Sequence, residues 1–544
     1  MHRNKSVNIH QFSMVPRADI PRSTFRRQWA HKTTFNDDYL IPIYVDEVLP
    51  GDTFSLKMTS FARLATPIFP IMDNLHLESF FFFVPNRIIW THWVNMMGEQ
   101  ANPGDSISYT VPVCSFTSAA PYAVGSVQDY MGLPTVGQFA TGTWSHNNLP
   151  LRAYNLIWNE WFRDQNLQNS VTVDKGDGPD TATNYVLLKR GKRHDYFTSG
   201  LPWTQKGGIA ITLPLGTSAP VRTSATDVVT GVQTGLFTRI ATNGLQPSVG
   251  TAVAFGPTPG AVGNSATAAT TPLTGVYPSN LYADLSQATA ATINQLRQSF
   301  QIQRLLERDA RSGTRYVEHI RGQWGCVLED YRAQRPVYLG GGYAPVNISP
   351  IAQTSATTIN GSTSTPLAQL AAIGHSTAHG HGFHQSFTEH GYIIGLVNVR
   401  GDQSYQQGLR RMWSRSTRYD FYLPVFATLG EQAVLNQEIY IQGVPATDAG
   451  VFAYQERWAE YRHFPSMITG LFRSTASGTL DAWHLSEKFT SLPTLSSTFI
   501  QSNTPVDRVV AVPSQPAFIF DSFFDCKTTR AMPLYSVPGL VDHF

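Results

Sequence analysis

The chain has 544 residues, of which 42% are hydrophobic and only 14% charged, and its formal net charge is +2. Charged residues usually make up about 25% of a globular protein, so much of this surface is neutral polar or apolar. Such a surface suits assembly, and the alternative is a secreted β-rich protein. No apolar segment of signal-peptide type follows Met1, and apolar runs such as Phe80 to Val84 are far too short to cross a membrane. We therefore expect a soluble protein that is made and kept in a cytoplasm.

Residues 1–40 are predicted to form a basic N-terminal arm. Residues 1–35 contain seven lysines and arginines against the single acid Asp19. The candidate DNA contacts are Arg3, Lys5, Arg17, Arg22, Arg26, Arg27 and Lys32. Phe12, Phe25 and Trp29 lie between them and could stack on bases, as aromatic residues do in single-strand binders. The alternatives are an arm that clasps a neighbouring subunit and a disordered segment.

Strand patterns dominate the rest of the chain. Phe54, Leu56 and Met58 alternate with polar residues, which indicates a half-buried strand. The segments 392–399 and 517–524 read as nearly continuously buried strands. Because such strands are separated by insertions longer than themselves, we predict a mainly β fold, an eight-stranded antiparallel jelly-roll sandwich with large loops and a few helices. Its strands would lie within residues 41–206 and 281–525.

Two neutral segments and one helix interrupt this pattern. Residues 207–280 hold only three charged side chains and are predicted to form a separate insertion, since a structureless linker of that length is improbable inside a compact domain. Residues 355–372 read as another surface loop. A proline-free segment predicts a helix over residues 286–311, with Gly313 as its stop. We expect the arginines of this helix to form a solvated or salt-bridged face rather than a nucleic-acid surface.

Signals for catalysis are weak. The sequence contains no nucleophile elbow, phosphate loop, zinc-protease motif or EF-hand pattern. The histidines of segment 375–390 and the acidic loop 174–180 could hold a metal ion, but a structural role is favoured for both. Three widely spaced cysteines, Cys114, Cys326 and Cys526, predict reduced thiols. We therefore expect no catalytic residue, no cofactor and no metal.

Blocks of family-specific sequence are spread over the whole chain. They are DEVLPGDTF at 46–54, WNEWFRDQNL at 158–167, RDARSGTRY at 308–316, SFTEHGY at 386–392, GLRRMW at 408–413, GEQAV at 430–434, ERWAEYR at 456–462 and FDCKTTRAMPLYSVPGLVDHF at 524–544. Together they closely resemble the major capsid proteins of gokushoviruses, small single-stranded-DNA phages of the microvirus group. One departure is Asp38, which stands where glycine is expected in the turn from Phe35 to Leu40.

The resemblance implies a self-assembling subunit of a T=1 icosahedral shell that encloses a single-stranded DNA genome. In that family the region matching 207–280 clusters at three-fold axes as a protrusion, which makes Arg239 and Phe255 candidates for facing a host receptor. Further partners implied are an internal scaffolding protein, a minor pilot protein, a small basic DNA-packing protein and a host cell-surface receptor. Assembly would take place in the cytoplasm of a host bacterium, without membrane insertion.

The C-terminal segment 526–544 is predicted to pack on a neighbouring subunit, because it ends in prolines, aromatics and aliphatics that need a surface. Its candidate interface residues are Pro533, Leu534, Tyr535, Val537, Pro538, Leu540 and Phe544. The competing function class is a β-sandwich protein that binds or cleaves carbohydrate, whose stacking platforms could come from 11 tryptophans and 22 tyrosines. That alternative requires a paired carboxylate site, which a sequence cannot show.

Overall fold

The computed structural model describes residues 21–138, 141–207, 293–325, 327, 332–355 and 368–535, and the backbone of eight short strands between these ranges. The chain divides into two compact units. One comprises Met1–Thr204 with Gly313–Phe544, and the other is Gln205–Ser312. The first unit contains the large sheet and is described first.

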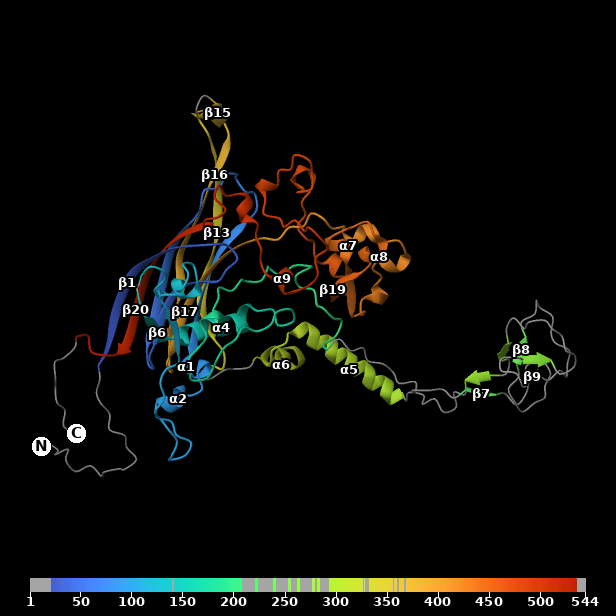
Figure 1. Ribbon diagram of the computed structural model, residues 1–544, viewed down its shortest axis with the longest axis horizontal. Helices are drawn as coiled ribbons and strands as arrows, with labels where there is room; N and C mark the ends of the chain where they lie inside the picture. The colour runs from blue at the N-terminus through green and yellow to red at the C-terminus, as the bar shows by residue number, and fades with distance from the viewer. Residues whose placement is uncertain are drawn as a thin grey trace. The chain divides into compact units, whose positions relative to one another are not determined.

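Eight antiparallel strands form the sheet of the first unit (Figure 1). In spatial order they are β1 (Arg22–Phe35), β20 (Phe518–Ala531), β3 (Thr53–Leu64), β16 (Leu370–Ser386), β13 (Val337–Ala352), β4 (Leu75–Pro85), β17 (Gly391–Gly401) and β2 (Ile41–Val48). We call the first four strands sheet 1 and the last four sheet 2; β16 and β13 pair and join them. This order, with strands from opposite ends of the chain side by side, confirms the predicted jelly-roll fold.

The main core lies between the two sheets. Phe54 and Phe518 of sheet 1 pack in one buried cluster with Phe81 and Ile393 of sheet 2. Burial alternates strictly along β3, where Phe54, Leu56 and Met58 point inward as predicted. Alternation of this kind means that sheet 1 packs on its inner face only.

Three strands of sheet 2, β4, β17 and β2, are largely buried on both faces, whereas β13 is mostly exposed or half-buried. Every residue of β17 is buried, which confirms the predicted strand over residues 392–399. Its outer face packs against α1 (Asn86–Ile89), α4 (Leu149–Ile157) and the π-helix η1 (Trp158–Phe162), which lie on the side of the barrel away from β1 and β20 in Figure 1. A sheet covered by helices must present apolar side chains in both directions, and this explains the continuous apolar run.

The expectation of continuous burial over residues 517–524 was wrong. β20 alternates like β3, and Ile519 and Phe523 point outward with 51% and 45% of their surface exposed. The apolar run arises because this strand has large apolar side chains at its outward positions as well as at its inward ones. An apolar run therefore does not by itself establish that both faces of a strand are covered.

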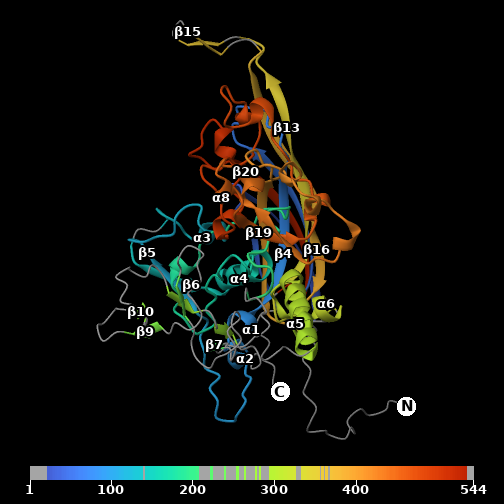
Figure 2. The same ribbon diagram turned by 90° about the vertical axis from the view of Figure 1, so that its right-hand side faces the viewer.

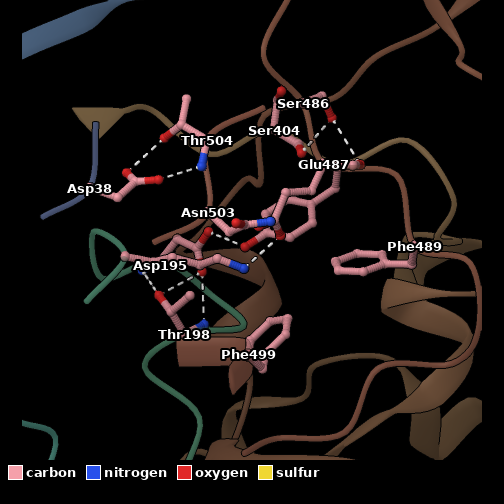
Figure 3. Close-up of polar contacts among 12 residues, drawn as sticks. Asp38, Asp195, Thr198, Ser404, Ser486, Glu487, Phe489, Phe499, Asn503 and Thr504 are labelled. Atoms are coloured by element: carbon pink, nitrogen blue, oxygen red, sulfur yellow. Dashed lines mark hydrogen bonds and ion pairs between the residues drawn. The ribbon is translucent and has the colours of Figure 1, made fainter. Parts of the chain in front are cut away.

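The turn before β2 shows how a substitution for glycine is accommodated. Asp38 adopts a left-handed backbone with φ of +67°, a conformation that asparagine and aspartate tolerate better than most residues. Its carboxylate accepts hydrogen bonds from the backbone N–H and the hydroxyl of Thr504, at 2.6 and 2.9 Å (Figure 3). Nearby, Lys192 pairs with Glu487 at 2.6 Å. These contacts fix the 484–504 segment against the start of sheet 2.

The long connections contain the remaining elements of the first unit. They are α2 (Trp93–Met96), β5 (Val113–Thr117), α3 (Val127–Tyr130), β6 (Thr143–Asn147), η2 (Ala182–Asn184), α6 (Tyr316–Trp324), β14 (Thr357–Ile359), β15 (Ser362–Thr365), η4 (Arg411–Ser414), η5 (Arg418–Asp420), η6 (Pro424–Phe426), β18 (Glu431–Leu435), α7 (Asn436–Ile439), α8 (Pro445–Asp448), β19 (Val451–Glu456), η7 (Ala459–Tyr461), η8 (Gly470–Phe472), η9 (Asp481–Trp483), α9 (Ser497–Ile500) and η10 (Val506–Arg508). The strands β13 and β16 run on to the β14–β15 hairpin, so the predicted loop 355–372 contains a hairpin (Figure 2).

The second unit contains α5 (Ile293–Ser312) and three two-stranded pairs. The pairs are β7 (Val221–Thr223) with β12 (Leu281–Ala283), β8 (Thr238–Ile240) with β11 (Val276–Pro278), and β9 (Val253–Phe255) with β10 (Val262–Asn264). The predicted helix is confirmed from residue 293 onward, and residues 286–292 lie outside the described part. Among the helices that the structure describes, none is both long enough and apolar enough to cross a membrane.

Candidate assembly and nucleic-acid surfaces

The outward side chains of sheet 1 are exposed or half-buried on β1, β3, β16 and β20, and we call this outer face the open face. Its outward positions on β1, β3 and β20 carry six cationic side chains and two carboxylates among the described residues. The cations are Arg22, Arg26, Lys32, Lys57, Arg63 and Lys527, and the carboxylates are Asp521 and Asp525. The face therefore has a clear positive excess, although the whole chain is nearly neutral.

The predicted DNA contacts of residues 22–32 lie on β1 and have partners within the same chain. The Arg26 guanidinium donates two hydrogen bonds to Asp525, at 2.9 and 2.8 Å, and this contact lowers the pKa of the Asp525 carboxyl. Lys32 pairs with Asp521 at 2.5 Å. Arg22 donates to the Gly51 carbonyl. These cations are thus held in place on a strand, and DNA binding by them stays a prediction.

Arg27 differs from its neighbours because its side chain points into the barrel. It pairs with Asp46 at 2.5 Å and lies 5.8 Å from the ring centroid of Phe54. This position makes Arg27 part of the end of the core rather than of the open face. Arg3, Lys5 and Arg17 lie outside the described residues.

The histidines singled out in the sequence divide between the two faces of β16. The His375 ring stacks on Phe61 of the open face, with centroids 6.4 Å apart. His375 is half-buried, and His379 and His384 are exposed. His381 is buried and lies 2.8 Å from the Ser79 hydroxyl, and burial lowers its pKa. Within the described part of the chain, no group of three His, Cys, Asp or Glu is placed to hold a metal ion.

The acidic loop 174–180 has a structural role on the covered side of sheet 2. Asp180 pairs with Arg152 of α4 through two hydrogen bonds of 2.7 and 2.5 Å, and both side chains are almost fully buried. Asp177 accepts a hydrogen bond from the Trp90 indole at 2.8 Å. Cys114 and Cys526 are free and buried, which agrees with reduced thiols.

A second surface is formed by irregular segments between β17 and β20. Exposed aromatic and methionine side chains gather here with arginines, and we call this set the arginine–aromatic patch. Its apolar members are Met412, Tyr419, Phe421, Tyr422, Tyr461, Phe464 and Met467, each between 44% and 67% exposed. Tyr422 contacts Tyr461 with ring centroids 6.2 Å apart, and Tyr419 contacts Phe426 at 6.3 Å.

Arginines order this patch. The Arg410 guanidinium lies 3.7 Å from the ring centroid of Phe464, and Arg415 lies 4.4 Å from that of Tyr461. Arg415 is also paired with Glu460 at 3.0 Å. A cavity of about 260 Å³ opens in the patch between Tyr405, Arg415 and Met467. Exposed rings held in place by arginines are typical of protein interfaces.

Sequence reasoning missed both the patch and half of the open face. The patch lies on short 3₁₀ turns and irregular segments whose residues come together only through tertiary contacts, so no periodic signal marks it. Lys57 and Arg63, by contrast, occupy the polar positions of the alternating β3 pattern, and that alternation could have placed them on one face.

The residues predicted for the tail and the insertion are only partly placed. Pro533, Leu534 and Tyr535 follow β20 and are exposed, Tyr535 to 81%. Val537, Pro538, Leu540 and Phe544 lie outside the described residues. Arg239 is on β8 opposite Tyr277, and Phe255 is on β9 opposite Val262. Their proposed roles at a subunit interface and at a receptor stay predictions.

Comparison with known proteins relates these surfaces to a family. Residues 13–540 match the family described as "Capsid protein (F protein)". The chain is 45% identical to "Capsid protein VP1" of Bdellovibrio phage phiMH2K, over 99% of each chain. It is 44% identical to "Capsid protein VP1" of Chlamydia phage 1 and 36% identical to "Capsid protein VP1" of Spiroplasma virus 4, with 98% of each chain covered in both cases.

These matches confirm the resemblance found in the sequence and favour the capsid function over the carbohydrate-binding alternative. A match that spans nearly the whole of both chains includes the jelly-roll strands, the insertion and the connections that carry the arginine–aromatic patch. The chain therefore belongs to the phage capsid (F) protein family and is a major capsid protein of gokushovirus type.

Proposed function

We propose that this capsid protein assembles into the T=1 icosahedral shell of a small single-stranded-DNA phage, encloses the genome and presents residues 207–280 at the three-fold axes for host attachment. The role is structural and not enzymatic. Assembly takes place in the cytoplasm of a host bacterium, with an internal scaffolding protein, a pilot protein and a small basic DNA-packing protein as partners. The family match supports the shell itself, and the three-fold placement rests on the resemblance.

The arginine–aromatic patch is the observation that carries the assembly proposal. A soluble monomer exposes few clustered aromatic side chains, and large apolar patches usually mark interaction sites. Here seven large apolar side chains are exposed beside Arg410 and Arg415, in a chain with only 14% charged residues. Stacked and ion-paired arginines already restrict these side chains, so their ordering on association costs less conformational entropy. The patch is thus suited to a subunit contact.

The assembly proposal is tested by changing the patch without touching the core. In the variant Tyr461→Ser with Phe464→Ser we expect folded, soluble subunits that sediment as monomers or small oligomers. The control Val124→Ser removes a side chain that is 77% exposed and lies outside the patch, and it should form shells normally. Shells of normal yield from the double variant, seen by sedimentation and negative-stain electron microscopy, would show that the patch is not an assembly contact.

Host attachment has a separate test. Loops that emerge from a rigid scaffold often carry binding function, and residues 207–280 are poor in charge. Replacing residues 230–270 by a short linker should leave particle yield unchanged and abolish adsorption to the host. Loss of both properties would make the insertion a structural clamp, and retention of both would place the receptor site elsewhere.

A further inference from the structure

The open face of sheet 1 combines cations with exposed aromatic rings. Phe61 and Phe523 are 39% and 45% exposed, although large apolar side chains on an uncovered sheet face are unfavourable in water. Phe523 pairs with Thr59, two residues from Phe61 on β3, so the two rings occupy diagonal positions on one face. Diagonal positions of this kind are about 7–8 Å apart at the backbone. Cations flank the rings on three strands.

Only Arg26 and Lys32 of the six cations have a carboxylate partner among the described residues. The other four are Arg22, which donates to the Gly51 carbonyl, and Lys57, Arg63 and Lys527. Lys57 is the register partner of Asp525, but Asp525 is held by both hydrogen bonds of Arg26. Arg63 lies at the other end of β3, 5.8 Å from the Phe61 ring centroid, and the described contacts give it no ion pair. Lys57 and Arg63 therefore retain donors for an anion brought from outside.

The positive charge of the open face limits which kind of molecule can bind there. A second copy of the chain that presented the same face would bring six cations against six, and like charges in contact are strongly disfavoured. An apolar partner would satisfy the phenylalanines and leave the lysines and arginines desolvated. A polyanion that also carries flat rings satisfies both kinds of side chain. Single-stranded nucleic acid has this chemistry, because bases stack on aromatic side chains while cations bind the phosphates.

We propose that the open face of sheet 1 is a single-stranded DNA platform, in which Phe61 and Phe523 stack on bases and Lys57, Arg63 and Lys527 bind phosphates. This inference rests on the proposed function, since it identifies the surface that meets the enclosed genome. On this proposal, the main contact with DNA is made by the four paired strands of sheet 1 and not by an N-terminal arm. The histidine that stacks on Phe61, His375, extends the same platform onto β16.

Photo-cross-linking tests the platform on the unmodified full-length chain. A ten-residue oligothymidylate that contains 4-thiothymidine is irradiated with the protein at low salt, and cross-linked peptides are mapped by mass spectrometry. We expect cross-links at Phe61 and Phe523, in peptides of β3 and β20. Cross-links confined to residues 1–20 or to the arginine–aromatic patch, or the absence of any cross-link, would overturn the platform.

Variants then separate the phosphate contacts from the stacking contacts. Lys57→Gln with Arg63→Gln should weaken oligonucleotide binding about fivefold to tenfold and make the slope of log affinity against log salt shallower by about 1.4, since each phosphate contact contributes about 0.7 for a single strand. Phe61→Leu should reduce cross-linking and affinity without changing this slope. The matched control Arg462→Gln removes an arginine that is 54% exposed and lies outside the open face, and it should change neither.

Shell yield is measured for the same variants, so that failure of the platform and failure of the proposed assembly can be told apart. Normal shells with weakened DNA binding support the platform. Normal shells with unchanged affinity and an unchanged salt slope contradict it and leave the capsid function intact. If the double variant yields no folded protein, the cross-link map of the unmodified chain still decides the question.

Discussion

The two sheets of the barrel share one core but differ in how far their outer faces are buried. Sheet 1 alternates between buried and exposed residues, whereas β17 of sheet 2 is buried at every position. The helices of the long connection between β4 and β13 pack on β4 and β17 of sheet 2, whereas the outward side chains of β1, β3 and β20 in sheet 1 are exposed or half-buried. The jelly roll is therefore asymmetric: inserted helices pack on one outer face, and the other outer face is exposed and rich in cations. We call this arrangement the polarised barrel.

The largest effect is expected when a charge is placed on each outer face in turn. Leu396 is 1% exposed under the helices of sheet 2, and Ile519 is 51% exposed on the open face. Leu396→Lys should cost at least about 3 kcal/mol in the free energy of unfolding, because it buries an unpaired charge. Ile519→Lys should be nearly neutral. Urea unfolding compares the two variants, and equal losses would contradict the polarised barrel.

A stability loss of similar size is expected at the buried ion pair, and almost none at the exposed one. Arg152 and Asp180 are both buried under sheet 2, so Arg152→Ala leaves a buried carboxylate unpaired and should cost about 3–5 kcal/mol. The exposed pair of Arg26 and Asp525 on the open face contributes little, and Arg26→Ala should leave the unfolding midpoint almost unchanged. A large loss in the Arg26 variant would show that sheet 1 depends on its surface charges.

The smallest effect concerns pH. Burial raises the pKa of Asp180, but hydrogen bonds from Arg152, Tyr185 and Asn148 outweigh burial and lower it overall. A lowered folded-state pKa gives stability that is present above the unfolded value of about 3.9 and is lost as the pH falls through the folded pKa. The difference in melting temperature between the unmodified chain and Asp180→Asn should therefore be constant near neutral pH and shrink below about pH 4. A difference that is constant down to pH 2 would contradict this linkage.

Local patterns predicted much of the barrel. The alternation of Phe54, Leu56 and Met58 correctly indicated a strand with one buried face, and the continuous run over residues 392–399 correctly indicated a strand buried on both faces. These strand patterns depend on neighbouring residues, which a sequence displays directly. The family resemblance marked Asp38 as a residue at a glycine position, and it has a left-handed backbone. The low charge of residues 207–280 predicted a separate insertion, and this stays a prediction.

The parts that were missed depend on contacts between distant segments. Arg26 meets Asp525 across 499 positions of the chain, and no local pattern shows that β1 pairs with β20. Residues 22–35 therefore read as part of an arm, although they form an edge strand. Ile519 and Phe523 were predicted to be core residues, because an apolar side chain in the sequence does not show which face of the sheet it occupies. No local pattern predicted the arginine–aromatic patch, because its residues come together only through contacts between distant segments.

Electron cryomicroscopy of filled and empty particles tests the central claim most directly. The difference map should show ordered density on the inside of the shell against the open face of sheet 1, in stacking contact with Phe61 and Phe523 and beside Lys57 and Arg63. The arginine–aromatic patch should lie in a contact between subunits. Two results would contradict the proposal that the open face binds the genome. In one, the open face lies on the outer surface of the shell; in the other, the genome density contacts only the N-terminal residues before β1.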